Sequence, residues 1–488
     1  MDIFQILTSS AWSILMIAVF FGGSIFVHEL GHFWVAKKRG VKVDRFSIGF
    51  GPAIFKWTGK DGVEYRLSWL PLGGYVALPQ LADMRGLEGE PTGDVESLPS
   101  PSYTTRMLVF GAGAFMNVLF AFALATILWK VGLPTSADMQ RAKIGHVLPE
   151  IELPDKTKVP SPAAKAGLRT GDTILAIDGN AVGTWDEMRQ MLFTGAGRTE
   201  DGRPRAVLTV RRGEETLTLI AEPVLAGDER MRMLGVSPFE RLKVGEVRAG
   251  SLAERAGLQV GDVMIALDDV PLGGGRDYVA GLRADPAKPG RLVVERAGET
   301  VTLVVPPRAD VQEPADLGVA FESDLILIHP TPWKQITDNV RMTFRTLWSL
   351  LHRGSDVGIS KLSGPIGIAR VFHMTAQIDI RYVLWFTIIV NVNLAIFNLL
   401  PLPVLDGGHM LFATIGKLRG KALPHGFIHT AQTVFVAALL TMMLYVSFFD
   451  VRRWSRDARA EEPAEEAPDP AASPASAPDA LPVVVPVK

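Results

Sequence analysis

Residues 11–32 read AWSILMIAVFFGGSIFVHELGH, an apolar run that ends in a His-Glu-x-x-His motif. The run carries no charge from Ala11 to Val27, and roughly 20 apolar residues suffice for a helix to cross a bilayer. A cleaved signal peptide is the weaker interpretation, because such a peptide has basic residues before its apolar run. Here the only charged residue before the run is Asp2, and the basic residues 37–39 follow it. Since ionisable groups are costly at membrane depth, the motif marks a candidate functional site.

The composition agrees with a membrane protein of several domains. The chain has 488 residues, 48% of them hydrophobic, and its net charge of −2 gives no indication of nucleic-acid binding. It contains no cysteine. Disulfides, thiolate metal ligands and a cysteine nucleophile are therefore excluded, and any metal has to be held by His, Asp or Glu.

Four apolar runs are long enough to span about 30 Å of hydrocarbon at about 1.5 Å per residue. The first holds the motif, and the other three lie at 107–129, 382–405 and 427–449. We therefore predict a multi-span α-helical membrane protein. Its four transmembrane helices are expected in the segments 1–36, 107–130, 381–412 and 427–449.

The basic residues orient these helices, because short cytoplasmic loops carry an excess of Lys and Arg. Five basic residues lie between positions 37 and 45, and three between 417 and 421. Both loops are predicted to be cytoplasmic, which puts residues 130–381 and both termini outside the cytoplasm. The four arginines between 452 and 459 disagree, but two loops outweigh one tail.

The external region contains an internal repeat. The stretch SPAAKAGLRTGD, from Ser161 to Asp172, recurs from Ser251 to Asp262 as SLAERAGLQVGD. Each copy indicates a short helix that ends at glycine, then a turn into a strand, with strand-like runs on both sides. The pattern resembles the PDZ fold twice in tandem. Two α+β domains are expected, at residues 140–228 and 238–310.

A β-rich region is predicted between the first two spans. Ala53–Trp57 and Val63–Leu70 alternate in hydrophobicity around Lys60-Asp61-Gly62, a strong hairpin signal, and Pro71–Val76 continues the pattern. We expect residues 37–106 to form a membrane-associated β-hairpin region.

Three further segments complete the chain. The polar stretch 80–104 is predicted to be a loop. The connector 325–380 contains Trp333–His352, whose apolar spacing fits either an amphipathic helix on the membrane surface or a helix packed in the bundle. The tail 451–488, rich in Pro, Ala and Glu, has a disordered composition.

The opening motif has the spacing of a metal site. His28 and His32 are four residues apart, so a helix projects both from one face. Glu29 is about 100° further round the helix, close enough to take a proton from a water at the metal. The alternative is a buried polar cluster that binds no metal.

A third protein ligand is expected after the third apolar run, since a catalytic zinc site has three protein ligands and an open position. The run from Asn398 to His409 reads NLLPLPVLDGGH, with Asp406 at the edge of the apolar segment and two prolines before it. Non-helical backbone at membrane depth must line a cavity or be buried in protein. Asp406 is the best candidate, but His409 fits the spacing too, and a carboxylate that caps the next helix is a further interpretation.

Taken together, these motifs resemble the site-2-protease-type intramembrane zinc metalloproteases, in the bacterial sigma-E-protease subgroup with tandem PDZ domains. HELGH, the NLLPLPVLDGGH run, Leu362-Ser-Gly-Pro-Ile-Gly and both repeats occur in the family's order, over about residues 5–450. The resemblance implies that His28, His32 and Asp406 bind Zn²⁺ and that Glu29 is the general base.

Substrate-binding roles follow from the same resemblance. Asn398 is expected to hold the substrate strand or the developing oxyanion. Gly73, Gly74 and Tyr75 belong to the β element expected to pair with an unwound substrate. Asn117 lies where the family has a Gly-Pro-x-x-Asn pattern, and the resemblance implies that it contacts the substrate; Ala114 replaces the proline of that pattern here.

The expected function is regulated intramembrane proteolysis in a bacterial inner membrane, with the active site near the cytoplasmic face and the PDZ domains and both termini in the periplasm. The substrate would be a single-span membrane protein of the anti-sigma-factor type, cut after a first external cleavage; leftover signal peptides are also plausible. The PDZ pair would bind a peptide or the substrate's external domain, or act as a gate. A non-catalytic PDZ scaffold and an ion transporter are the competing hypotheses, and the missing inverted repeat of spans counts against the transporter.

Overall fold

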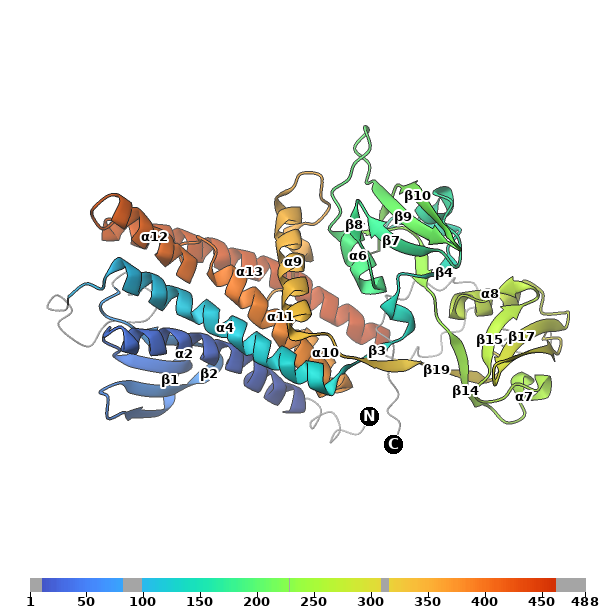
Figure 1. Cartoon of the computed structure of the whole chain (residues 1–488), viewed down its shortest axis with the longest axis horizontal. Coiled ribbons are helices and arrows are strands. Elements are labelled where there is room, and N and C mark those ends of the chain that lie inside the picture. Colours follow the sequence, from blue (N-terminus) through green and yellow to red (C-terminus); the bar gives the residue numbers. More distant parts are fainter. Residues whose placement is uncertain (1–10, 82–98, 228, 309–315, 462–488) are drawn as a thin grey trace. The chain divides into compact units, whose positions relative to one another are not determined.

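The computed structural model describes residues 11–81, 99–227, 229–308 and 316–461. Residues 82–98 of the predicted loop and 462–488 of the predicted tail lie outside this part of the chain. The chain divides into two compact units (Figure 1). The first comprises the residues up to Leu133, Ile328–Phe344 and those from Ile359 onward, and the second comprises Pro134–Leu327 and Arg345–Gly358.

The first unit contains four helices that are long and apolar enough to cross a membrane, as predicted. The first runs from Ala11 to Lys38 and includes a π-helical segment, η1 (Ile17–Phe21), followed by α2 (Gly22–Lys38). The others are α4 (Tyr103–Val131), α11 (Ile380–Asn398) and α13 (His425–Glu461).

Helix α4 is the centre of this unit, with α2 and α11 packed against it. The approach of α2 is very close, because a Cβ added at Gly31 would lie 2.4 Å from the carbonyl oxygen of Ala112. Further along α4, Ala121 and Ala125 form a buried cluster with Ile388 of α11. Small residues on α4 and on α2 therefore bring three helices together, as is usual where helices pack in membranes.

The third predicted segment, 381–412, is not one continuous helix. α11 ends at Asn398, and α12 (Asp406–Leu418) starts after an irregular loop. Proline cannot continue a helix, so Pro401 and Pro403 separate the two. Asp406 is thus the first residue of a new helix rather than a position inside a span.

The tail expected from residue 451 begins later, since α13 continues to Glu461. Buried Asp450 accepts hydrogen bonds from the backbone N–H groups of Gly364 and Gly367, at 2.8 and 2.9 Å. Arg453 contacts Asp450 and donates to the carbonyl oxygen of Leu362 at 3.1 Å. These bonds fix the end of α13 to η5 (Ile359–Lys361) and α10 (Pro365–Ile378), so part of the basic run that opposed the predicted orientation has a structural role.

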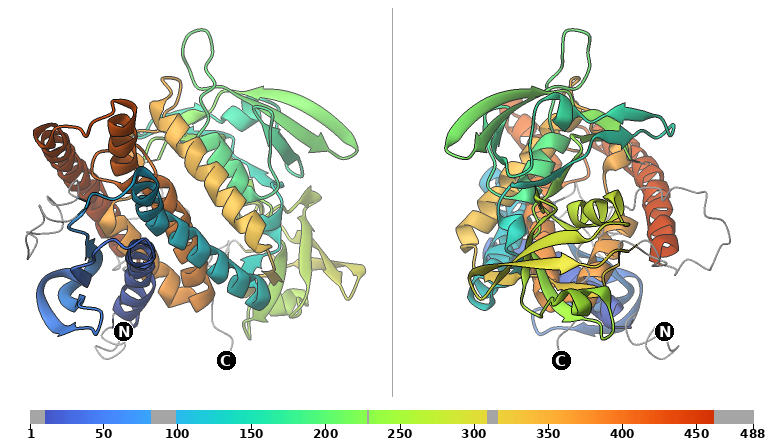
Figure 2. Two further views of the ribbon diagram at one scale, coloured as in Figure 1. Left: turned by 60° about the vertical axis from the view of Figure 1, so that its left-hand side comes forward. Right: turned by 90° about the vertical axis from the view of Figure 1, so that its right-hand side faces the viewer.

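The predicted hairpin is present as β1 (Arg45–Thr58) and β2 (Glu64–Ala77), which curl beside α2 (Figure 2). Both strands bend at glycines, including Gly49 at φ 84° and Gly73 at φ 146°. As a result, residues 45–48 pair with 64–67 on one side and with 74–77 on the other. No other strand of the described chain pairs with the outer side of 74–77, which makes it an edge.

The second unit contains two lobes that share one plan. The first lobe has sheet order β10-β9-β7-β8 with a separate β13-β4 pair, and the second has β18-β17-β15-β14-β19 with β16 on β15. The elements of the first lobe are β4 (Ile144–Val147), α5 (Pro162–Lys165), β7 (Thr173–Ile177), β8 (Asn180–Ala181), α6 (Trp185–Phe193), β9 (Ala206–Arg212), β10 (Glu215–Ala221) and β13 (Val236–Pro238). Those of the second are β14 (Leu242–Val247), α7 (Leu252–Ala256), β15 (Val263–Leu267), β16 (Val270–Pro271), α8 (Gly275–Ala284), β17 (Gly290–Arg296), β18 (Glu299–Val305) and β19 (Val319–Glu322).

Short strands complete this unit. They are β3 (Leu133–Ser136) with β20 (Leu325–Ile328), β5 (Glu150–Glu152) with β6 (Lys158–Pro160), and β11 (Val224–Ala226) with β12 (Met231–Met233). The first lobe closes with β13, which lies beyond its predicted end at residue 228, and the second closes with β19, which lies beyond residue 310. These closing strands have only three and four residues, too few for a hydrophobic pattern to reveal.

The aspartate that ends each repeat is buried and paired in the same way in both lobes. Arg212 bonds both oxygens of Asp172, at 2.8 and 2.7 Å, and Arg296 bonds both oxygens of Asp262, at 2.7 Å each. Each arginine also donates to the carbonyl oxygen of the glycine in the repeat's Ala-Gly-Leu. A bidentate guanidinium offsets the cost of burying the carboxylate, which explains why the repeat keeps Asp at this position. The glycine is kept for its positive φ, 75° at Gly167 and 80° at Gly257.

The helix expected at Trp333–His352 is α9 (Pro332–Leu351). Its residues up to 344 belong to the first unit and those from 345 to the second. In the first unit, Ile336 packs in the cluster around Ala121, and Gln335 donates to the carbonyl oxygen of Ala125 at 3.1 Å. This half of α9 is therefore a bundle-packing helix.

Candidate metal centre

Two helices bring the predicted metal ligands together. His28 and His32 project from α2, and Asp406 opens α12. The three offer ligand atoms that all lie within 4.8 Å of one another. Gly407 and Gly408 let the preceding loop fold over the start of α12, because a Cβ on Gly408 would lie 2.0 Å from the carbonyl oxygen of Leu402.

The spacing of the donor atoms fits a tetrahedral metal. The Nε2 atoms of His28 and His32 are 3.1 Å apart, and they lie 3.3 and 3.4 Å from Oδ2 of Asp406. Zinc bonds of about 2.0–2.1 Å give a tetrahedron whose edges are roughly 3.3–3.4 Å. The buried Oδ2 accepts no hydrogen bond. Three donor atoms that face one another in this way suit a cation between them, with the fourth position left open.

Helix α4 supplies the surroundings of both imidazoles. Nδ1 of His32 lies 2.8 Å from the carbonyl oxygen of Val109, and Nδ1 of His28 lies 3.3 Å from Nδ2 of Asn117. A Cβ on Gly113 would be 2.5 Å from Nε2 of His32 and 2.7 Å from Nε2 of His28. Only glycine at 113 leaves the two ligand nitrogens in place.

Glu29 lies where the hairpin passes α2. A Cβ on Gly74 would be 3.0 Å from Cγ of Glu29 and 2.9 Å from the carbonyl oxygen of Ser47. The edge segment, which begins at Gly74 directly after Gly73 and includes Tyr75, therefore runs beside the predicted base, and only a residue without a side chain at 74 allows this approach.

The remaining predicted residues are placed as follows. Asn398 is the half-buried last residue of α11, at the start of the loop to Asp406. Asn117 is fully buried, on the α4 face that contacts His28. His409 does not join the ligand cluster, because its ring stacks on Phe110 with the centroids 5.2 Å apart.

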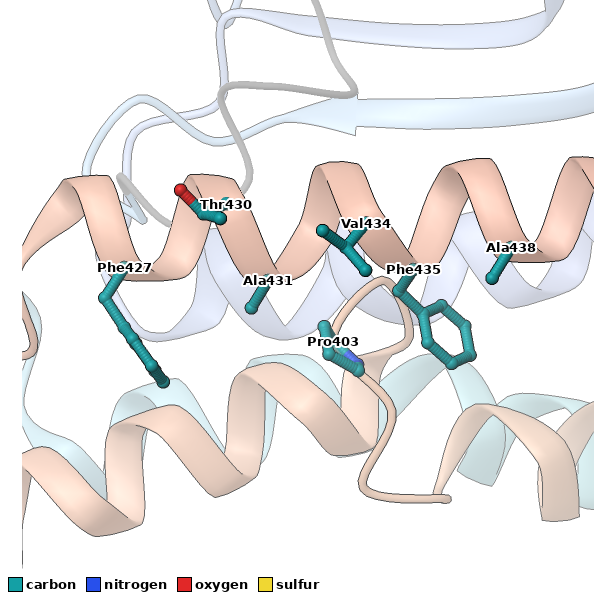
Figure 3. A pocket seen from close by; sticks show the side chains of 7 residues that line it. All are labelled: Pro403, Phe427, Thr430, Ala431, Val434, Phe435 and Ala438. Carbon is teal, nitrogen blue, oxygen red and sulfur yellow. The ribbon is translucent and has the colours of Figure 1, made fainter.

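An apolar groove of about 400 Å³ borders the loop that leads to Asp406. Pro403, three residues before Asp406, forms one side, and the side chain of Phe435 lies next to it (Figure 3). The rest of the lining comes from the first half of α13, namely Phe427, Thr430, Ala431, Val434 and Ala438.

Sequence reasoning missed two members of the site, Val109 and Gly113. Val109 contributes a backbone oxygen, so its side chain leaves no signal in the sequence. Gly113 directly precedes Ala114 in the pattern around Asn117, and the pattern predicts no role for this glycine. An unexplained glycine in an apolar helix indicates a close approach, and this signal could have identified Gly113.

Comparison with known proteins adds an independent finding. The sequence model of Peptidase family M50 matches residues 16–442. The regulator of sigma-E protease RseP of Salmonella typhimurium is 31% identical over 466 residues, which cover 90% of this chain and 99% of that protein. The RseP of Escherichia coli K12 is 30% identical over 479 residues, covering 90% and 99%. The "Putative zinc metalloprotease" of Vibrio cholerae is 30% identical over 476 residues, covering 92% and 100%. The residues that the family model matches include the His28 motif and the loop before Asp406.

Proposed function

Since the chain belongs to peptidase family M50 and is a zinc metalloprotease of the membrane, we propose that it cuts single-span membrane proteins within or at the edge of the bilayer. One observation carries the proposal: a buried triangle of His28, His32 and Asp406 at the end of an apolar helix. Ionisable groups placed so deep require a partner or a function.

We propose that His28, His32 and Asp406 hold the zinc. When bound, zinc supplies a Lewis acid that polarises the scissile carbonyl and eases ionisation of water. Glu29 takes the proton of the attacking water and delivers it to the amide nitrogen as the C–N bond breaks. The apolar helices around these residues keep bulk water away and strengthen each of these electrostatic interactions.

The edge at residues 74–77 supports a way of presenting the substrate. A transmembrane helix has its amides bonded internally, so the segment to be cut has to unwind first. An unwound strand that pairs with this edge regains main-chain hydrogen bonds. We propose that Gly73, Gly74 and Tyr75 bind it there, beside Glu29, and that Asn398 holds it from the end of α11.

The apolar groove beside Pro403 favours an apolar substrate. Its side chains are hydrophobic apart from Thr430, as expected for a surface that receives residues of a membrane span. We propose that apolar side chains of the unwound segment enter this groove next to the cut.

We propose an inner-membrane location with the site near the cytoplasmic face, supported by the basic residues in the last turn of α2 and directly after it. The strongly exposed Phe55, Trp57 and Trp69 of the hairpin suit the membrane interface. Relatives named as regulators of sigma-E protease favour an anti-sigma factor as substrate.

We further propose that the two lobes of the second unit are PDZ domains outside the cytoplasm. Their shared plan and the twice-used Asp–Arg pair support one repeated fold. Their place in the chain between the second and third spans suits a gate that admits only substrates already trimmed outside. If a form lacking residues 140–310 still discriminated against untrimmed substrates, the gate would be excluded.

The test compares wild type with Glu29→Gln on single-span membrane proteins with short external tails. We expect wild type to cut inside the span and Glu29→Gln to be inactive while it still binds zinc. Equal cleavage by both would refute Glu29 as the base. No cleavage by wild type of any trimmed candidate, together with no bound zinc, would favour a non-catalytic scaffold.

A further inference from the structure

Asn117 is a buried amide with one unused atom. Its side chain has no exposure, its Nδ2 lies 3.3 Å from Nδ1 of His28, and its Oδ1 is buried without a hydrogen-bond partner. A buried polar atom without a partner is uncommon and calls for an explanation.

His32, the neighbouring proposed ligand, shows which ring nitrogen has to carry the hydrogen. Nδ1 of His32 faces the carbonyl oxygen of Val109 at 2.8 Å, and a carbonyl oxygen only accepts. Nδ1 of His32 is therefore the protonated nitrogen, and the lone pair of Nε2 points to Asp406 and His28. A ligand histidine commonly donates its other ring N–H in this way, which fixes its tautomer and orientation.

His28 needs the same tautomer to offer Nε2 to the same metal. Its Nδ1 then carries the hydrogen and requires an acceptor, which only the oxygen of the Asn117 amide can provide at this contact. The oxygen and nitrogen of an amide have nearly the same shape, so a half-turn of the side chain exchanges them without moving the backbone. The half-turn gives the unused Oδ1 its partner.

We propose that Asn117 is a positioning residue that holds His28 in its metal-binding tautomer by accepting a hydrogen bond from Nδ1–H. The inference rests on the proposed metal centre. It gives Asn117 a task different from the substrate contact that the family resemblance implies, and it makes α4 the common source of orientation for both histidines.

The experiment measures zinc affinity of the full-length protein in detergent by chelator competition, and the absorption spectrum of the Co²⁺-loaded protein. Asn117→Leu keeps the branched shape and removes the acceptor, so we expect about 10–100-fold weaker zinc binding and an altered Co²⁺ spectrum. Asn117→Asp can only accept, so it should bind zinc at least as tightly as wild type.

Asn391 provides a matched control. It is as buried as Asn117 and joins α11 to α2, but its Nδ2 donates to Ser24 Oγ at 2.8 Å and to the carbonyl oxygen of Thr387 at 2.9 Å instead of facing a histidine. Asn391→Leu should lower stability and leave zinc affinity and the Co²⁺ spectrum unchanged.

Two results would overturn the inference. One is wild-type affinity and spectrum in Asn117→Leu. The other is weakened affinity in Asn117→Asp, because a carboxylate repels an unprotonated Nδ1; this variant decides the question even if Asn117→Leu does not fold. Failure of the metal centre itself looks different, since zinc would then be absent from wild type or retained in His32→Ala.

Discussion

Replacement of Gly113 by alanine should remove the metal without harming the helix that carries it. The new Cβ would lie 2.5 Å from Nε2 of His32 and 2.7 Å from Nε2 of His28, whereas ordinary contact begins at 3.4 Å. The imidazoles would have to retreat by about 0.7–0.9 Å, which is several times the roughly 0.2 Å that a metal site tolerates. We expect zinc affinity to fall by at least the factor of about 10–100 that loss of an outer hydrogen-bond partner causes.

Helix propensity works in the opposite direction. Alanine is favoured over glycine by about 1 kcal/mol inside a helix, so a loss of zinc binding in Gly113→Ala cannot come from a weakened α4. Gly111 is the matched control, because a Cβ there has nothing within 4 Å. Zinc content, chelator competition and cleavage of a single-span substrate should be lost in Gly113→Ala and kept in Gly111→Ala. Wild-type zinc affinity in Gly113→Ala would refute the placement of the metal between these nitrogens.

Two predictions concern the second unit. Asp356 bonds Arg232 at 2.7 Å and Arg198 at 2.6 Å, and the Arg232 side chain is only 1% exposed, so Asp356→Ala should cost about 3–5 kcal/mol of local stability. Amide hydrogen exchange in α6 and β12 would measure this, with the exposed Asp201→Ala as a control that should change nothing; equal exchange in both variants would contradict the pairing. Burial raises the pKa of Asp262, but the hydrogen bonds from Arg296 and a backbone N–H outweigh it and leave the pKa lowered. A carboxyl group whose pKa is lower in the folded than in the unfolded chain stabilises the fold at pH values above its unfolded pKa of about 4. This stability is lost as the pH falls through the folded-state pKa. Amide hydrogen exchange in β15 should therefore become faster on acidification, and Arg296→Leu should abolish this pH dependence. An unchanged acid response in Arg296→Leu would contradict the role of the Asp262–Arg296 pair.

Much of the fold could be predicted because its signals are local. Apolar runs indicated four spans, a Lys-Asp-Gly turn indicated the hairpin, and two prolines indicated the break before Asp406. The extent of α13 could not be predicted, since it depends on bonds from Asp450 and Arg453 to residues almost 90 positions away. The packing of the first half of α9 against α4 could not be predicted either, because amphipathic spacing does not reveal whether a membrane surface or another helix covers the apolar face.

The candidate site shows the same division. Side chains with a fixed spacing, such as His28 and His32, could be identified directly, and Asp406 needed only a carboxylate at the edge of a span. Of the residues on α4, only Asn117 was predicted, as a substrate contact. The carbonyl oxygen of Val109 leaves no signal because every residue has one, and a glycine at 113 indicates a close approach without showing which side chains lie there.

The triangle of His28, His32 and Asp406 also has a consequence for assembly. Its members come from the first span and from the segment after the third, so no part of the nascent chain holds the full ligand set until nearly all of it has been made. Zinc should therefore load only after the third span has inserted and docked on α4. Bound at the proposed site, the ion would cross-link two distant parts of the chain, and its binding would contribute directly to the free energy of folding. Zinc occupancy would then serve the cell as a checkpoint for a completed bundle, because a half-inserted chain could not begin to cut its neighbours.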